Sequence, residues 1–191
     1  NKIVANFQAY TNSLALAHSY NLTPIYGFTT SYFPENPEIH KIFSFLKRNK
    51  VLVANHGYEH SLDFADPEKL AHEIFQANAD IAAFWGEPPK IVLVPSDTMD
   101  EKSMVKALAD TPIKAVGTLD KGYTFGVCEP FHEILFYERT SLQLCSKSVD
   151  NVPPFKSLFL YSRPFLPSMY VVTHIFNYIK KESAYQYIRD A

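Results

Sequence analysis

The sequence has 191 residues and a mass of 21.8 kDa, which fits a single domain. Hydrophobic residues make up 47% of it and charged residues 20%, so the composition excludes a wholly disordered chain. The net charge of −2, with no glycine-rich phosphate loop and no apolar run of about 18 residues, argues against nucleic-acid binding, a P-loop and a membrane span.

Helical and strand patterns alternate along the chain. Apolar residues at helical spacing predict helices over residues 4–20, 34–48, 66–85, 101–109 and 175–188. Short apolar runs predict strands over residues 25–29, 51–54, 91–94, 113–116, 131–137, 157–161 and 170–173. This alternation is typical of a parallel α/β sheet or barrel, in which functional groups lie at the C-terminal ends of the strands.

A polar segment that contains two histidines follows one of the predicted strands. His56 and His60 lie four residues apart, directly after the strand that ends at Ala54. If the turn is helical, both imidazoles can reach one divalent cation, and Gly57 permits a sharp turn between them. The alternative is a pair of loop histidines without a shared ligand, but the position at a strand end favours a metal-binding pair.

Two further segments follow strands in the same way. Pro95, Ser96 and Asp97 come after the predicted strand 91–94, where Asp97 has the alternative role of capping the next helix. His174 comes after the last predicted strand, and its alternative role is that of a hydrogen-bonded or helix-capping structural residue. The remaining histidines join no ligand pattern: His18, His40, His72 and His132.

Three stretches of the sequence carry a family resemblance. Residues 55–61 (Asn-His-Gly-Tyr-Glu-His-Ser) follow a strand and precede an acidic helix, and residues 88–95 (Pro-Pro-Lys-Ile-Val-Leu-Val-Pro) follow that helix. This order resembles the polysaccharide deacetylase superfamily, also called NodB-like. Residues 172–178 (Val-Thr-His-Ile-Phe-Asn-Tyr) are also similar to the end of the N-deacetylase domain of heparan sulfate N-deacetylase/sulfotransferases.

The resemblance implies a fold and an activity. The expected fold is a distorted (β/α) barrel of about seven units, with residues 1–191 forming a single deacetylase-like catalytic domain. The expected activity is metal-dependent removal of N-acetyl or O-acetyl groups from an amino-sugar polysaccharide or oligosaccharide. A secreted, periplasmic or cell-envelope location is the favoured expectation.

The resemblance also implies roles for individual residues. His56 and His60 would be metal ligands, His174 the general acid, and Asp97 a candidate catalytic or ligand carboxylate. Zn²⁺ is the expected ion because imidazole suits it and because catalytic zinc keeps a position open for water. The residues expected to contact the substrate are Tyr58, Pro95, Ser96, Asn177 and Tyr178.

The sequence departs from the family pattern in two places. The family has paired aspartates at the end of its first strand, one a ligand and the other the base, but this chain has no Asp-Asp and its first aspartate is Asp63. The expected place of that pair lies just upstream of Asn1, so we expect the domain either to be N-terminally incomplete or to lack the motif. The second departure is at residues 93–97, which contain no arginine where the family usually has one.

These departures leave two alternatives open. One is a deacetylase-like domain that binds glycan without catalysis, and the other is an unrelated metal-dependent amide hydrolase on a barrel.

The two cysteines, Cys128 and Cys145, either form a disulfide or lie apart as small buried residues.

Overall fold

The computed structural model describes residues 6–19, 21, 23–95, 99–118, 128–131 and 134–138. Helices and strands alternate over most of these residues, as the sequence predicts. In chain order the elements are α1 (Phe7–Ser19), β1 (Ile25–Phe28), the 3-10 turn η1 (Thr30–Tyr32), α2 (Ile39–Arg48), β2 (Leu52–Asn55), α3 (Pro67–Trp85), β3 (Ile91–Leu93), α4 (Glu101–Leu108), β4 (Ala115–Thr118), β5 (Cys128–Phe131) and β6 (Ile134–Glu138).

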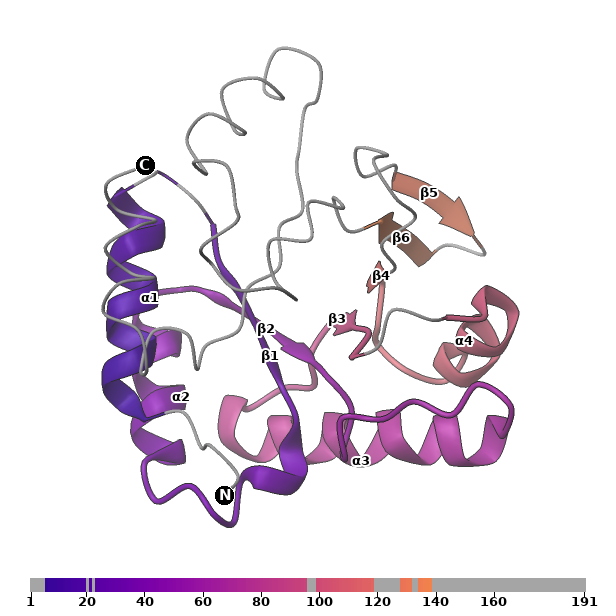
Figure 1. Ribbon diagram of the computed structural model, residues 1–191, viewed down its shortest axis with the longest axis horizontal. Coiled ribbons are helices and arrows are strands. Elements are labelled where there is room, and N and C mark those ends of the chain that lie inside the picture. The colour runs from indigo at the N-terminus through magenta and orange to yellow at the C-terminus, as the bar shows by residue number, and fades with distance from the viewer. Residues whose placement is uncertain are drawn as a thin grey trace, which may run out of the picture.

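The described strands form one six-stranded sheet in the order β1-β2-β3-β4-β6-β5. Neighbouring strands from β1 to β6 pair in parallel, whereas β5 pairs antiparallel with β6 at the edge. In Figure 1 the helices lie around the strands, with α1 and α2 together, α3 along the bottom and α4 at the opposite side from α1. The architecture is α/β with a largely parallel sheet, a partial (β/α) barrel of the kind that the sequence predicts.

Among the described residues, two apolar clusters fill the space between the helices and the sheet. The first joins α1 and α2 to β1 and β2, and its rings include Phe28 and Phe43, whose centroids lie 4.6 Å apart. The second joins α3 and α4 to β3 and β4, where Val92 and Val116 are fully buried. Because the two clusters pack against β1, β2, β3 and β4, the ends of these strands are held in fixed positions for a site at the sheet edge.

The predicted strand 131–137 is wrong in its extent. The structure has two strands in this region, β5 and β6, and their antiparallel pairing sets Phe131 opposite Ile134. The polar pair His132-Glu133 interrupts the apolar residues in the sequence, so these residues are divided between two strands. An antiparallel hairpin therefore edges an otherwise parallel sheet.

The second helix begins later than predicted. The sequence predicts a helix from residue 34, but α2 begins at Ile39 with Glu38 as its N-cap. Pro37 disfavours the helical conformation of the residue before it. That residue, Asn36, uses its side-chain oxygen to accept a hydrogen bond from the backbone N–H of Glu38 at 3.0 Å.

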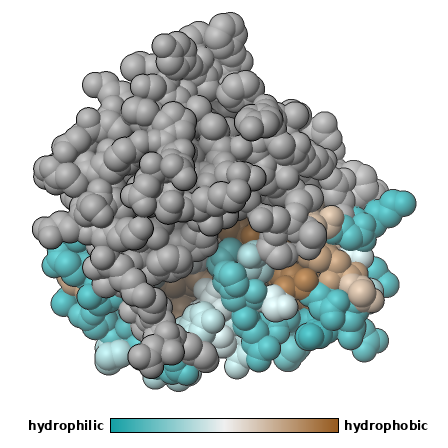
Figure 2. Space-filling model, viewed as in Figure 1, coloured by the Kyte–Doolittle hydropathy of each residue, from teal (hydrophilic) through white to brown (hydrophobic). Residues whose placement is uncertain are grey.

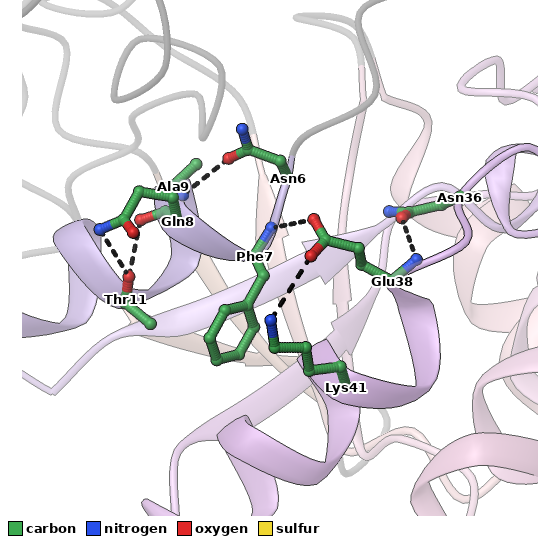
Figure 3. Close-up of polar contacts among 8 residues, drawn as sticks. All are labelled: Asn6, Phe7, Gln8, Ala9, Thr11, Asn36, Glu38 and Lys41. Carbon is green, nitrogen blue, oxygen red and sulfur yellow. Dashed lines mark hydrogen bonds and ion pairs between the residues drawn. The ribbon is translucent and has the colours of Figure 1, made fainter.

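Glu38 also joins α1 to α2 (Figure 3). Its carboxylate accepts a hydrogen bond from the backbone N–H of Phe7 at 2.8 Å and pairs with Lys41 at 3.6 Å. The Lys41 ammonium lies 4.0 Å from the centroid of the Phe7 ring. One carboxylate thus lies at the N-termini of two helices, where negative charge is stabilising.

The surface of the described residues differs in polarity from the apolar clusters of the interior. Described residues on the face shown in Figure 2 are mostly hydrophilic, with smaller hydrophobic areas between them. Within the part of the chain that the structure describes, no helix has the length and apolarity needed to span a membrane.

Candidate metal site

The loop after β2 brings the two predicted metal ligands together. His56 is the first residue after the strand, and its ring centroid lies 4.7 Å from that of His60, with the ring planes 78° apart. The condition of a helical turn between them is not met, because residues 56–60 form no helix. Left-handed backbone at Gly57 (φ 82°) and His60 (φ 63°) reverses the chain instead and brings the imidazoles side by side.

A hydrogen bond fixes the orientation of the His56 ring. Its Nδ1 atom lies 2.6 Å from the carbonyl oxygen of Leu93, at the end of β3. Because a carbonyl oxygen only accepts, Nδ1 carries the hydrogen, and in the neutral imidazole Nε2 is then the nitrogen able to coordinate a metal. Metal-binding histidines are commonly held by such a bond to a backbone carbonyl, which fixes both tautomer and ring direction.

Gly27 in β1 leaves room for this ring. A Cβ atom at Gly27 would lie 3.0 Å from Cδ1 of Leu93 and 3.3 Å from Cβ of His56. The backbone N–H of His56 also donates to the carbonyl of Phe28 at 3.0 Å. Three neighbouring strands, β1, β2 and β3, therefore define the position of the first histidine.

Two buried polar side chains support the loop and were missed by the sequence analysis. Asn55 donates to the carbonyl of Ile74 and to Oδ1 of Asn78, both at 2.9 Å, and accepts from the N–H of Gly57 at 2.7 Å. Glu73 in α3 accepts two further backbone hydrogen bonds from the loop. The sequence does contain a signal that Glu73 is buried. Its spacing on α3 places it on the apolar face of that helix, with Leu70 and Ala77.

The structure brings four of the predicted site residues to one edge of the sheet. His56 and His60 lie together, and half-buried Pro95 follows β3, whose Leu93 holds the His56 ring. Tyr58 lies in the loop between the histidines and is also half-buried. Five predicted residues lie outside the described part of the chain: Ser96, Asp97, His174, Asn177 and Tyr178.

The donor set fits part of a zinc site. Two imidazoles supply two of the three protein ligands that a catalytic zinc usually has, and the exposed His60 ring leaves access for water. No group of three or more His, Cys, Asp or Glu side chains suited to a metal occurs among the described residues. A third ligand from Asp97, or from an aspartate upstream of this sequence, stays a prediction.

The remaining sequence predictions concern residues away from this loop. His18, His40 and His72 are exposed on helices. Cys128 lies in β5 and Cys145 outside the described residues, so their pairing is not tested. The predicted elements over residues 157–161, 170–173 and 175–188 also lie outside them.

Comparison with known proteins shows the fold of the chain. No protein-family model and no curated protein matches the sequence. A Mycobacterium smegmatis protein assigned as a polysaccharide deacetylase superposes with a TM-score of 0.65 and 16% identity, over 95% of this chain and 68% of that one. A wild-type CE4 family pseudoenzyme from Bacillus anthracis gives a TM-score of 0.61 and 13% identity, over 98% and 56%. Puue allantoinase gives 0.63 and 12%, over 96% and 65%.

These matches define the class of fold. The structural neighbours include CE4, NodB-like polysaccharide deacetylases and other barrel proteins, and the chain has a partial (β/α) barrel of that kind. The chain spans between about half and two thirds of the length of most of these proteins. At such low identities the likeness establishes the fold alone, and the resemblance of residues 172–178 to heparan sulfate N-deacetylases stays a prediction.

Proposed function

We propose that this chain is a metal-dependent deacetylase that removes N-acetyl or O-acetyl groups from an amino-sugar polysaccharide or oligosaccharide. The observation that carries the proposal is the pairing of His56 and His60, with ring centroids 4.7 Å apart, at the C-terminal edge of a NodB-like sheet. Functional groups of parallel α/β folds gather at that edge. The hydrogen bond between Nδ1 of His56 and the Leu93 carbonyl supports the same function, because it leaves Nε2 able to coordinate a metal.

His56 and His60 would hold the ion, with Asp97 or an upstream aspartate as the third ligand. Zn²⁺ is the expected ion because it suits imidazole ligands. When bound, such an ion lowers the pKa of a coordinated water toward about 7 and polarises an acetyl carbonyl. Hydrolysis then breaks the C–N bond of the acetamide, with the hydroxyl going to the acetyl carbon and a proton to the amine.

His174 is proposed to give that proton to the leaving amine. Imidazole titrates near neutrality, so one group can carry a proton and release it under the same conditions. The proposed contacts to the sugar come from five residues: Tyr58, Pro95, Ser96, Asn177 and Tyr178. N-acetylated glycosaminoglycan is included among the substrates because of the resemblance of residues 172–178.

A second candidate function is glycan binding without catalysis. It is favoured by one observation, the absence of an Asp-Asp pair from the 191 residues. A CE4 family pseudoenzyme is among the proteins that share the fold. On this alternative the chain binds N-acetylated oligosaccharide but releases no acetate.

Acetate release tests the proposed function. We expect the zinc-loaded chain to release acetate from chitin oligosaccharides or N-acetylheparosan, and a chelator to stop the release until zinc is restored.

His174→Ala should keep its zinc and lower kcat by roughly 10²–10⁴-fold, which is the usual contribution of a general acid. Release that a chelator does not affect would contradict the metal dependence, and unchanged turnover in His174→Ala would remove that residue from catalysis.

A further inference from the structure

We propose that Glu73 is a positioning residue for the metal-binding pair: its buried carboxylate holds the backbone between the histidines so that His60 stays beside His56. This inference rests on the proposed function, because it concerns the same two imidazoles. Glu73 belongs to α3, and neither the family resemblance nor the sequence pattern assigns it a role.

The contacts of Glu73 are concentrated on the loop. Its side chain is only 4% exposed, and its Oε2 atom accepts hydrogen bonds from the backbone N–H groups of Tyr58 at 3.0 Å and Glu59 at 2.9 Å. A buried carboxylate is costly unless hydrogen bonds satisfy it. Two successive backbone N–H groups that converge on one carboxylate oxygen form a concave anion site, and such charge-assisted bonds are among the stronger ones.

The backbone of this loop needs to be held. His60 has a left-handed conformation (φ 63°), which costs energy for a residue with a Cβ atom and persists only where the surroundings enforce it. Asn55 binds the N–H of Gly57, and Glu73 binds the next two N–H groups. Without Glu73, residues 58–60 can relax toward ordinary backbone angles, and the His60 ring then moves away from His56.

The other side of the loop has anchors that do not involve Glu73. The carbonyl of Tyr58 accepts from the N–H of Ser31 at 2.9 Å, and that of Gly57 accepts from the N–H of Thr30 at 3.3 Å. The Thr30 hydroxyl donates to Asp80 of α3 at 2.7 Å. We therefore expect the fold to survive the loss of Glu73, with the effect confined to the geometry of the two imidazoles.

Zinc affinity measured on folded variants tests this role. We expect Glu73→Ala to weaken zinc binding about 10–100-fold, the usual cost of losing a group that orients metal ligands. Glu73→Gln should recover most of the affinity, because its amide oxygen can accept the same two hydrogen bonds. The matched control is Glu68→Ala, which removes an exposed glutamate from the same helix and should bind zinc as the wild type does. Circular dichroism establishes that each variant is folded.

The outcomes separate this inference from the proposed function. A folded Glu73→Ala chain with the zinc affinity of a zinc-binding wild type would overturn the positioning role and leave the metal site standing. If Glu73→Ala does not fold, Glu73→Asp decides: its carboxylate is one methylene short of the loop, so reduced affinity supports the role and unchanged affinity overturns it. A wild-type chain that binds no zinc would overturn the metal site itself.

Discussion

Replacing His60 by alanine is expected to weaken zinc binding by at least ~100-fold while the chain stays folded. Loss of a group that only orients a metal ligand already costs about 10–100-fold, so loss of a ligand should cost more. The His60 side chain is exposed, and its ring contact in the described structure is with His56. Its removal therefore takes little packing from the core. A competition titration with a zinc chelator of known affinity measures the effect.

His72→Ala is the matched control for this experiment. His72 is an exposed histidine on α3, so its removal changes the histidine count without touching the loop. We expect its zinc affinity to equal that of the wild type. Equal affinities in the wild type and His60→Ala would exclude His60 as a ligand, and a loss in His72→Ala matching that in His60→Ala would indicate nonspecific binding.

Replacing Phe43 by alanine is expected to lower the free energy of unfolding by about 3–5 kcal/mol. The Phe43 side chain is 2% exposed, and its ring lies between those of Phe28 at 4.6 Å, Phe84 at 5.4 Å and Phe33 at 5.5 Å. Truncation removes apolar burial and leaves a cavity that this dense packing closes only in part. Urea denaturation followed by circular dichroism measures the change.

Phe75→Ala separates the effect of burial from that of residue type. Phe75 is also a phenylalanine on a helix, but it is 68% exposed. We expect its replacement to change the free energy of unfolding by no more than about 0.5 kcal/mol. A similar loss in both variants would contradict the packing of Phe43 in the core between α2 and the sheet.

Local sequence signals predicted most of the described elements. Helix α3 is the clearest example, because the side chain of Asp66 caps its first turn through the N–H groups of Glu68 and Lys69, and the helix ends before Gly86. Caps, breakers and periodic apolar residues act within a few positions of one another. They are therefore readable from the sequence, as was the placement of His56 and His60 after a buried strand.

Contacts between distant residues could not be predicted in this way. The Leu93 carbonyl that fixes the tautomer of His56 lies 37 positions away, and Glu73 reaches Tyr58 across 15 positions. Nothing in the local pattern states that a glutamate on the apolar face of a helix will meet two backbone N–H groups. The pairing of β5 with β6 was missed for a related reason, since the polar residues at 132 and 133 could equally belong to one strand with an exposed face.

The zinc content of the purified chain, measured by elemental mass spectrometry beside a His56→Ala variant, tests the metal site most directly. His56 is the better-fixed member of the pair, because β1, β2 and β3 together define its position and its Nδ1 hydrogen bond sets the tautomer. We expect about one zinc per chain in the wild type and none in His56→Ala, in keeping with a catalytic zinc held by imidazoles. A wild-type chain without zinc after exposure to excess metal, or a His56→Ala chain that keeps all of its zinc, would contradict the proposed site.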